Sequence, residues 1–234
     1  MFKLTRAETT KGLVRHKVLH LAGLFLFEFI VVLLGVMAAQ AAADWAEDRR
    51  LTRAAEVQFR EAREAALRSA QSMNFWATVG PCLIDRVKEV SRAAANGEAL
   101  PAARIGRPAL PWMNMPEWDP EVRRAAIARY GQAQMNSLAQ MEAGVDIARE
   151  TTIRLRDAWS TFLLLDPADG PPSDADRANV RLAAIRAIDH IRVLEVNTPT
   201  DEMRGLGIDA KEWKGGSPVA DDLDDCGLIR NWHQ

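Results

Sequence analysis

The sequence lacks the residues from which most catalytic and metal sites are built. Its 234 residues include only four histidines and two cysteines, Cys82 and Cys226. The cysteines have neither C-x-x-C spacing nor neighbouring histidines, which argues against a zinc site. No G-x-S-x-G, H-E-x-x-H or phosphate-binding glycine loop occurs in the chain. We therefore expect no enzyme activity, no cofactor and no bound metal.

An excess of one charge is also absent. The chain has 30 Lys and Arg against 32 Asp and Glu, a formal net charge of −2. A nucleic-acid-binding domain would present a basic face, so nucleic acid is not an expected partner. The one basic segment is residues 1–17, with five cations and one anion. It is expected to be a cytoplasmic tail that either leans on anionic lipid headgroups or only sets membrane topology.

Long apolar runs are absent with one exception, residues 18–43. This run reads VLHLAGLFLFEFIVVLLGVMAAQAAA, with no proline and one charge, Glu28. A bilayer core needs about 20 apolar residues in a helix, so the run predicts a transmembrane helix. Because no second run follows, the prediction is a single-pass protein whose first partner is the lipid bilayer.

A cleavable signal peptide is the alternative interpretation of this run, because the small residues at 41–43 would suit a cleavage site. The run is longer than the ~7–15 residues of a signal h-region, which favours an uncleaved anchor. Arg15 and Lys17 adjoin one end of the run, whereas Asp44 and Trp45 begin the other. This asymmetry predicts a bacterial inner-membrane protein with its N-terminus in the cytoplasm and most of the chain in the periplasm. Trp45 is the predicted membrane-interface anchor.

Glu28 is the residue of the span that needs a physical explanation. A charged carboxylate near the bilayer centre costs at least ~2.5–3.5 kcal/mol, so such residues normally face protein or water. At 100° per residue, Gly35 and Ala39 lie within about 20° of Glu28 on the helix surface. Small residues four apart favour close helix contact, so these three residues form the predicted helix–helix interface, with a second copy or with another membrane subunit. Proton conduction by Glu28, and simple tolerance of a neutral carboxyl in lipid, remain open.

Beyond the membrane the chain is predicted to be helical. Small or apolar residues recur at alternating steps of four and three, which is a heptad seam typical of a coiled coil. The seam residues are Ala55, Phe59, Ala62, Ala66, Ser69, Met73, Trp76, Gly80, Leu83, Val87, Val90 and Ala94. Pro81 predicts a kink or a break in this helix. Prolines spaced through residues 96–120 predict a connector without helix.

Two N-cap signals mark the later helices. Asp119 before Pro120 predicts a helix that continues through Leu165. Its expected stripe is Ala126, Tyr130, Ala133, Ser137, Met141, Gly144, Ala148, Leu155, Trp159 and Phe162. Ser173 predicts the start of a third helix, whose inner face is Val180, Ala184, Ala187, Ile191 and Leu194.

The predicted fold is therefore all-α. A single N-terminal transmembrane helix continues into a periplasmic antiparallel helical bundle over residues 44–199. Residues 200–234 are predicted to be an irregular acidic tail. In an oxidising compartment Cys82 and Cys226 are expected to form a disulfide, and two unrelated buried thiols are the alternative.

The span resembles that of a family of uncharacterised bacterial single-pass proteins, a domain of unknown function with the signature E-x₆-G-V-x₂-A-x₅-W. The matching residues are Glu28, Gly35, Val36, Ala39 and Trp45, all in register. The resemblance implies an inner-membrane anchor with a helical outer domain, and it implies no activity.

Three functions follow from these features. The first is a non-catalytic, membrane-anchored structural or accessory subunit of an inner-membrane assembly. The second is a proton-coupled motor-type subunit, because the topology resembles the smaller subunit of proton-driven membrane motors, although those use aspartate and mixed α/β outer domains. The third is a periplasmic helical sensor or ligand-binding module, which would lack a second span to return a signal.

Overall fold

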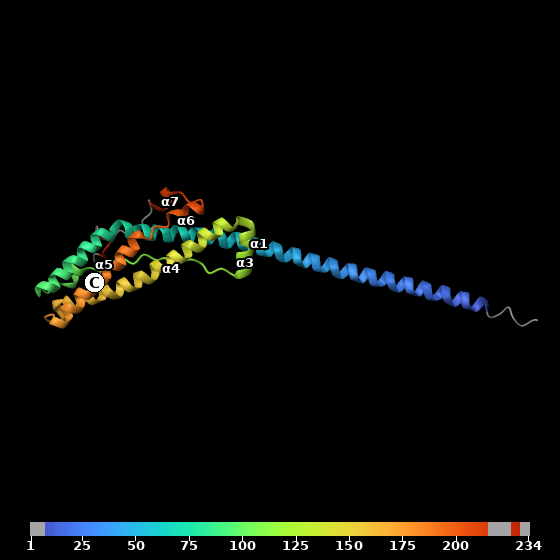
Figure 1. Cartoon of the computed structure of the whole chain (residues 1–234), viewed down its shortest axis with the longest axis horizontal. Coiled ribbons are helices and arrows are strands. Elements are labelled where there is room, and N and C mark those ends of the chain that lie inside the picture. Colours follow the sequence, from blue (N-terminus) through green and yellow to red (C-terminus); the bar gives the residue numbers. More distant parts are fainter. Residues whose placement is uncertain (1–7, 215–225, 230–234) are drawn as a thin grey trace, which may run out of the picture. The chain divides into compact units, whose positions relative to one another are not determined.

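The computed structural model of the chain describes residues 8–214 and 226–229, and side chains from residue 23 onward except that of Asp169. In these ranges the fold is all-α, as predicted, with a single isolated bridge between Pro108 and Leu228. The helices are α1 (Glu8–Asn96), α2 (Ala102–Ile105), α3 (Pro120–Tyr130), α4 (Gln132–Ser160), η1 (Thr161–Leu165), η2 (Pro167–Asp169), α5 (Asp174–Val196), α6 (Thr200–Gly205) and α7 (Ala210–Lys214) (Figure 1). The chain divides into two units, Met1–Arg53 and Ala54–Gln234, and α1 contributes to both.

The second unit is a helical bundle built on the later part of α1. All the predicted seam residues of α1 are buried, so the heptad prediction is confirmed. Pro81 lies inside α1 and does not break it. The helix instead bends where its colour passes from teal to green (Figure 1). Trp76 and Leu83, on either side of the proline, are both fully buried, and this packing outweighs one lost backbone hydrogen bond.

The connector between α1 and α3 runs back along α1. Ser72 Oγ donates to the carbonyl of Trp112 at 3.0 Å, and further along Gln58 Nε2 donates to the carbonyl of Glu117 at 2.6 Å. Because the connector returns the chain to the start of the bundle, α4 runs parallel to this part of α1, and α5 runs antiparallel to both (Figure 1).

The prediction of no helix in the connector is wrong for one turn. Helix α2 occupies Ala102–Ile105, between Pro101 and Gly106. Four residues fit between these two helix-breaking positions. The rest of the connector is irregular, as the proline spacing predicted.

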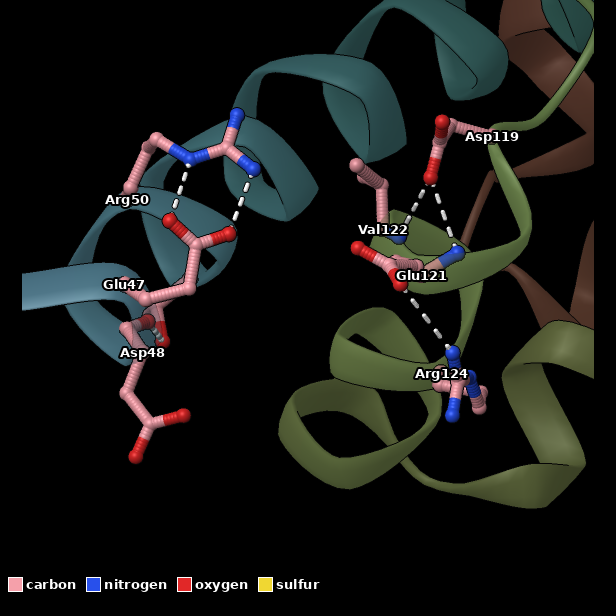
Figure 2. A network of polar contacts seen from close by, with 8 residues as sticks. Glu47, Asp48, Arg50, Asp119, Glu121, Val122 and Arg124 are labelled. Atoms are coloured by element: carbon pink, nitrogen blue, oxygen red, sulfur yellow. Dashed lines mark hydrogen bonds and ion pairs between the residues drawn. The ribbon is translucent and has the colours of Figure 1, made fainter. Parts of the chain in front are cut away.

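Helix α3 begins as predicted and ends earlier than predicted. The Asp119 side chain caps it by accepting from the backbone N–H groups of Glu121 and Val122 (Figure 2). Gly131, at φ +86°, then separates α3 from α4, since this backbone conformation favours glycine.

After this break the buried stripe of α4 begins with Met135 and Leu138 and not with the predicted Ala133 and Ser137. Ala133 is exposed, and Ser137 and Gly144 are half-buried. The buried residues of α4 are Met135, Leu138, Met141, Val145, Ala148, Thr151, Thr152, Leu155, Ala158 and Trp159.

Helix α5 agrees with the sequence in both its start and its inner face. Ser173 and Asp176 form a reciprocal capping box at its N-terminus. The hydrogen bonds that Ser173 donates hold the pKa of Asp176 below its ordinary value. The five predicted inner residues of α5 are all buried.

The prediction of an irregular tail is wrong for residues 200–214. Helices α6 and α7 form there, and they bury the side chains of Met203 and Trp213 completely. The Arg63 guanidinium donates to the carbonyls of Leu206 and Gly207 and so ties this segment to α1. Helices of five or six residues are too short to show a periodic pattern, which is why the sequence did not reveal them. The rest of the predicted tail, apart from 226–229, lies outside the described residues, as does the start of the basic tail at 1–7.

Candidate functional site

The first candidate site is the apolar part of α1 in the first unit. Among the described residues, α1 is the one helix long and apolar enough to cross a membrane, and the apolar stretch lies near the N-terminus. Every residue from 23 to 50 is exposed, including large apolar side chains such as Phe25 and Leu34. An apolar surface of this extent, without cover from its own unit, is suited to lipid or to another membrane helix.

The three predicted interface residues share one face of this helix. Glu28 has no hydrogen-bond or ion-pair partner among the described residues. A Cβ added at Gly35 would meet nothing within 4 Å, and the same holds at Gly23. At 100° per residue Gly23 lies about 140° from Glu28, whereas Gly35 and Ala39 lie within about 20° of it. Gly23 is therefore a natural control for any experiment on the Glu28 face.

Polar side chains organise the exit from the apolar stretch. The guanidinium carbon of Arg49 lies 4.4 Å from the ring centroid of Trp45, a cation–π contact. Arg50 donates to both carboxylate oxygens of Glu47, at 2.8 and 2.5 Å (Figure 2). These bonds lower the pKa of Glu47 below its ordinary value. An exposed Trp beside Arg residues fits the predicted interfacial position of Trp45.

The second candidate feature joins Cys82 of α1 to Cys226. The two residues are disulfide-bonded, with Cα atoms 5.2 Å apart across 144 positions of sequence. The segment after Cys226 pairs with the connector: Ala109 N donates to Gly227 O at 2.9 Å, and Ile229 N donates to Arg107 O at 2.8 Å. The disulfide thus fixes part of the connector as well as the segment 226–229.

A polar cleft between the connector and α4 was not anticipated from the sequence. It is lined by Asn114, Met115, Pro116, Glu117, Trp118, Arg123, Glu142, Asp146 and Arg149. The Glu142 carboxylate lies 3.8 Å from the Arg123 guanidinium. Burial raises the pKa of Glu142 above its ordinary value, and the charge of Arg123 and the indole of Trp118 only partly oppose this effect. Oε1 of Glu142 and Nε1 of Trp118 are buried and neither makes a hydrogen bond of regular geometry with a described residue.

An apolar pocket of about 300 Å³ was also missed. Its lining residues are Gly106, Arg107, Pro108, Leu110, Arg156, Asp157, Trp159, Ser160 and Leu163. They come from the connector, from the end of α4 and from η1, and the connector lies about fifty positions from the other two. Only the fold brings them together.

Comparison of the chain with protein-family models, with curated proteins and with solved structures finds no match.

Proposed function

We propose that this protein is a non-catalytic, membrane-anchored accessory subunit of an inner-membrane assembly. Its span holds it in the bilayer with the N-terminus in the cytoplasm, and its helical bundle lies in the periplasm. The observation that carries the proposal is the exposed apolar stretch of α1, which places an unpaired carboxyl, Glu28, on the same face as Gly35 and Ala39.

The cost of the carboxyl supports a helix partner on this face. A carboxyl exposed to hydrocarbon is unfavourable, and contact with another helix supplies a hydrogen-bond partner for it. The open space over Gly35 allows a second helix to approach closely. The disulfide between Cys82 and Cys226 supports an oxidising compartment for the bundle. The resemblance of the span to that of uncharacterised single-pass proteins supports the same arrangement.

The test compares two glycine substitutions in the full-length chain in its native membrane. Gly35→Leu places a large side chain on the Glu28 face, whereas Gly23→Leu places the same side chain on the opposite face. After gentle solubilisation, we expect Gly35→Leu to lose the co-purifying partner or second copy and Gly23→Leu to retain it. Equal loss in both variants would show a general effect on the span and would contradict an interface at Gly35.

Proton coupling by Glu28 is the second candidate function, because Glu28 is the single acid of the apolar stretch. Glu28→Gln preserves the size of the side chain and much of its hydrogen bonding. If Glu28 serves only packing, this variant assembles and functions nearly as the wild type does. If Glu28 carries protons, the variant assembles and loses proton-dependent activity of the complex. If neither Gly35→Leu nor Glu28→Gln changes assembly or phenotype, both functions are contradicted.

A further inference from the structure

The apolar pocket at the end of α4 has the features of a site for a small organic anion. Trp159, Leu110 and Leu163 give it an apolar lining, and two arginines, Arg107 and Arg156, also line it. We infer that this pocket binds a small aromatic or short aliphatic carboxylic acid, with the apolar body against Trp159 and the carboxylate at the arginines. This inference concerns the bundle alone and does not depend on the proposed membrane partner.

The size and lining of the pocket agree with those of small-molecule sites. Such sites measure about 300–1,000 Å³ and are mostly apolar with a few placed polar groups, and this pocket has a volume of about 300 Å³. The Trp159 indole is already satisfied, because Nε1 donates to the carbonyl of Gly106 at 2.9 Å. Its ring therefore offers apolar contact without an unpaired donor beneath it.

The charges of the pocket favour an anion. Arg107 makes no ion pair with any residue in the described ranges. Arg156 Nε lies 3.6 Å from Oδ1 of its neighbour Asp157, and both side chains are more than half exposed. An ion pair this exposed is weak, so the Arg156 guanidinium can exchange it for a ligand. The pocket thus carries two cations against one anion. A guanidinium fork can bind both oxygens of a carboxylate.

The pocket wall is held in place from two sides. On one side Trp159 binds the carbonyl of Gly106, and on the other Ile229 N donates to the carbonyl of Arg107. The segment that contains Ile229 begins at Cys226, which the disulfide ties to α1. A wall fixed before binding lowers the entropic cost of binding, so the disulfide is expected to support ligand affinity.

The test uses two soluble probes of the same size and shape, one charged and one neutral. 3-Phenylpropionate carries the carboxylate, and 3-phenylpropanamide is its neutral counterpart. Binding to the full-length protein in lipid nanodiscs is measured by ligand-observed NMR, with empty nanodiscs as background. We expect the acid to bind with a Kd in the millimolar range, about the strength that eleven non-hydrogen atoms provide, and the amide to bind at least about fivefold more weakly.

Matched variants identify the site. Arg107→Gln and Arg156→Gln are each expected to weaken the acid about fivefold and to leave the amide unchanged. Arg181→Gln, an exposed arginine on α5 outside the pocket, is the control and is expected to change neither probe. Leu110→Trp, which fills the pocket without altering its charge, is expected to abolish binding of both. The double variant Cys82→Ser/Cys226→Ser is expected to weaken the binding of both probes, because the pocket wall is then less firmly fixed.

Two outcomes would overturn the inference. One is equal binding of the acid and the amide to the wild-type protein, which would show that the charge of the ligand does not contribute to binding. The other is unchanged acid binding in both Arg107→Gln and Leu110→Trp, which would place any binding elsewhere. Thermal unfolding of each variant shows whether it is folded, and Leu110→Trp and the arginine variants alter different properties, so one unfolded variant leaves the test intact.

Discussion

Burial of the Glu142 side chain disfavours the charged form of its carboxyl group. Glu142 projects from α4 into the polar cleft beside Trp118 and Arg123. Desolvation raises its pKa, Arg123 and Trp118 lower it by less, and Asp146 adds a further increase. Its environment is not visible in the sequence, because Trp118 and Arg123 come from the connector and α3, about twenty positions earlier in the chain. A glutamate in a helix otherwise indicates only a solvated face.

The raised pKa leads to a prediction about pH. A carboxyl with a higher pKa in the folded state binds more protons when folded. The free energy of unfolding therefore falls as the pH rises from its ordinary pKa through the raised one. Glu142→Gln removes this titration. We expect the melting temperature of the variant to fall less than that of the wild type between pH 4.5 and 7.5, measured by circular dichroism. Glu150→Gln, at an exposed position of the same helix, is the control, and an unchanged pH profile in Glu142→Gln would contradict the prediction.

Whole elements were predictable where the periodic pattern was long. Every residue predicted for the seam of α1 and for the inner face of α5 is buried, because four or more turns of helix display their burial pattern in the sequence. The caps at Asp119 and Ser173 were also correct, since each needs one side chain in a fixed local position. The predicted burial pattern of α4 was wrong at its start, because Gly131 ends α3 and α4 begins after it in a new register. Helices α6 and α7 are stabilised by contacts with distant parts of the chain, which local patterns do not encode.

Alanine substitutions at two helical glycines, Gly144 and Gly205, are expected to change the stability of the bundle in opposite directions. A Cβ at Gly144 of α4 would lie 3.7 Å from Asn197 Oδ1 and 3.9 Å from Met73 Cε, which are ordinary contacts. A Cβ at Gly205 of α6 would overlap Ser137 Oγ and lie 2.9 Å from Ser137 Cβ. We expect Gly144→Ala to stabilise the protein by about 0.5–1 kcal/mol through helix propensity. Gly205→Ala should destabilise it by about 1–3 kcal/mol through overpacking. Urea unfolding of both variants measures the difference, and equal effects would show that α6 does not pack closely on α4.

At the scale of the molecule, the sequence predicted the candidate membrane-spanning helix and the helical bundle, but not the pocket or the polar cleft. The span is a continuous run of residues, so its composition alone reveals it. The pocket joins residues of the connector to residues at the end of α4 and in η1, and no local spacing relates the connector to the other two segments. The pairing of Cys82 with Cys226 was predictable only because the chain has no other cysteine.

The disulfide leads to a prediction for the whole bundle. Closing a loop across 144 positions stabilises the folded state by up to roughly 5 kcal/mol in the chain-entropy model. We expect protein taken from the membrane under alkylating conditions to yield, without reduction, a linked pair of peptides containing Cys82 and Cys226. Reduction should lower the urea midpoint of unfolding. Two alkylated, unlinked thiols would contradict both the bridge and the periplasmic position of the bundle.

Native mass spectrometry of the gently solubilised protein shows whether the chain is membrane-anchored and part of a larger assembly. It measures the mass of the assembly and, after dissociation in the gas phase, the mass of the chain. We expect an assembly heavier than one chain, containing either a second copy or another membrane subunit, and a full chain mass of 25.9 kDa. A lone monomer would contradict the accessory-subunit function, and a chain shortened to begin near Asp44 would contradict the membrane anchor.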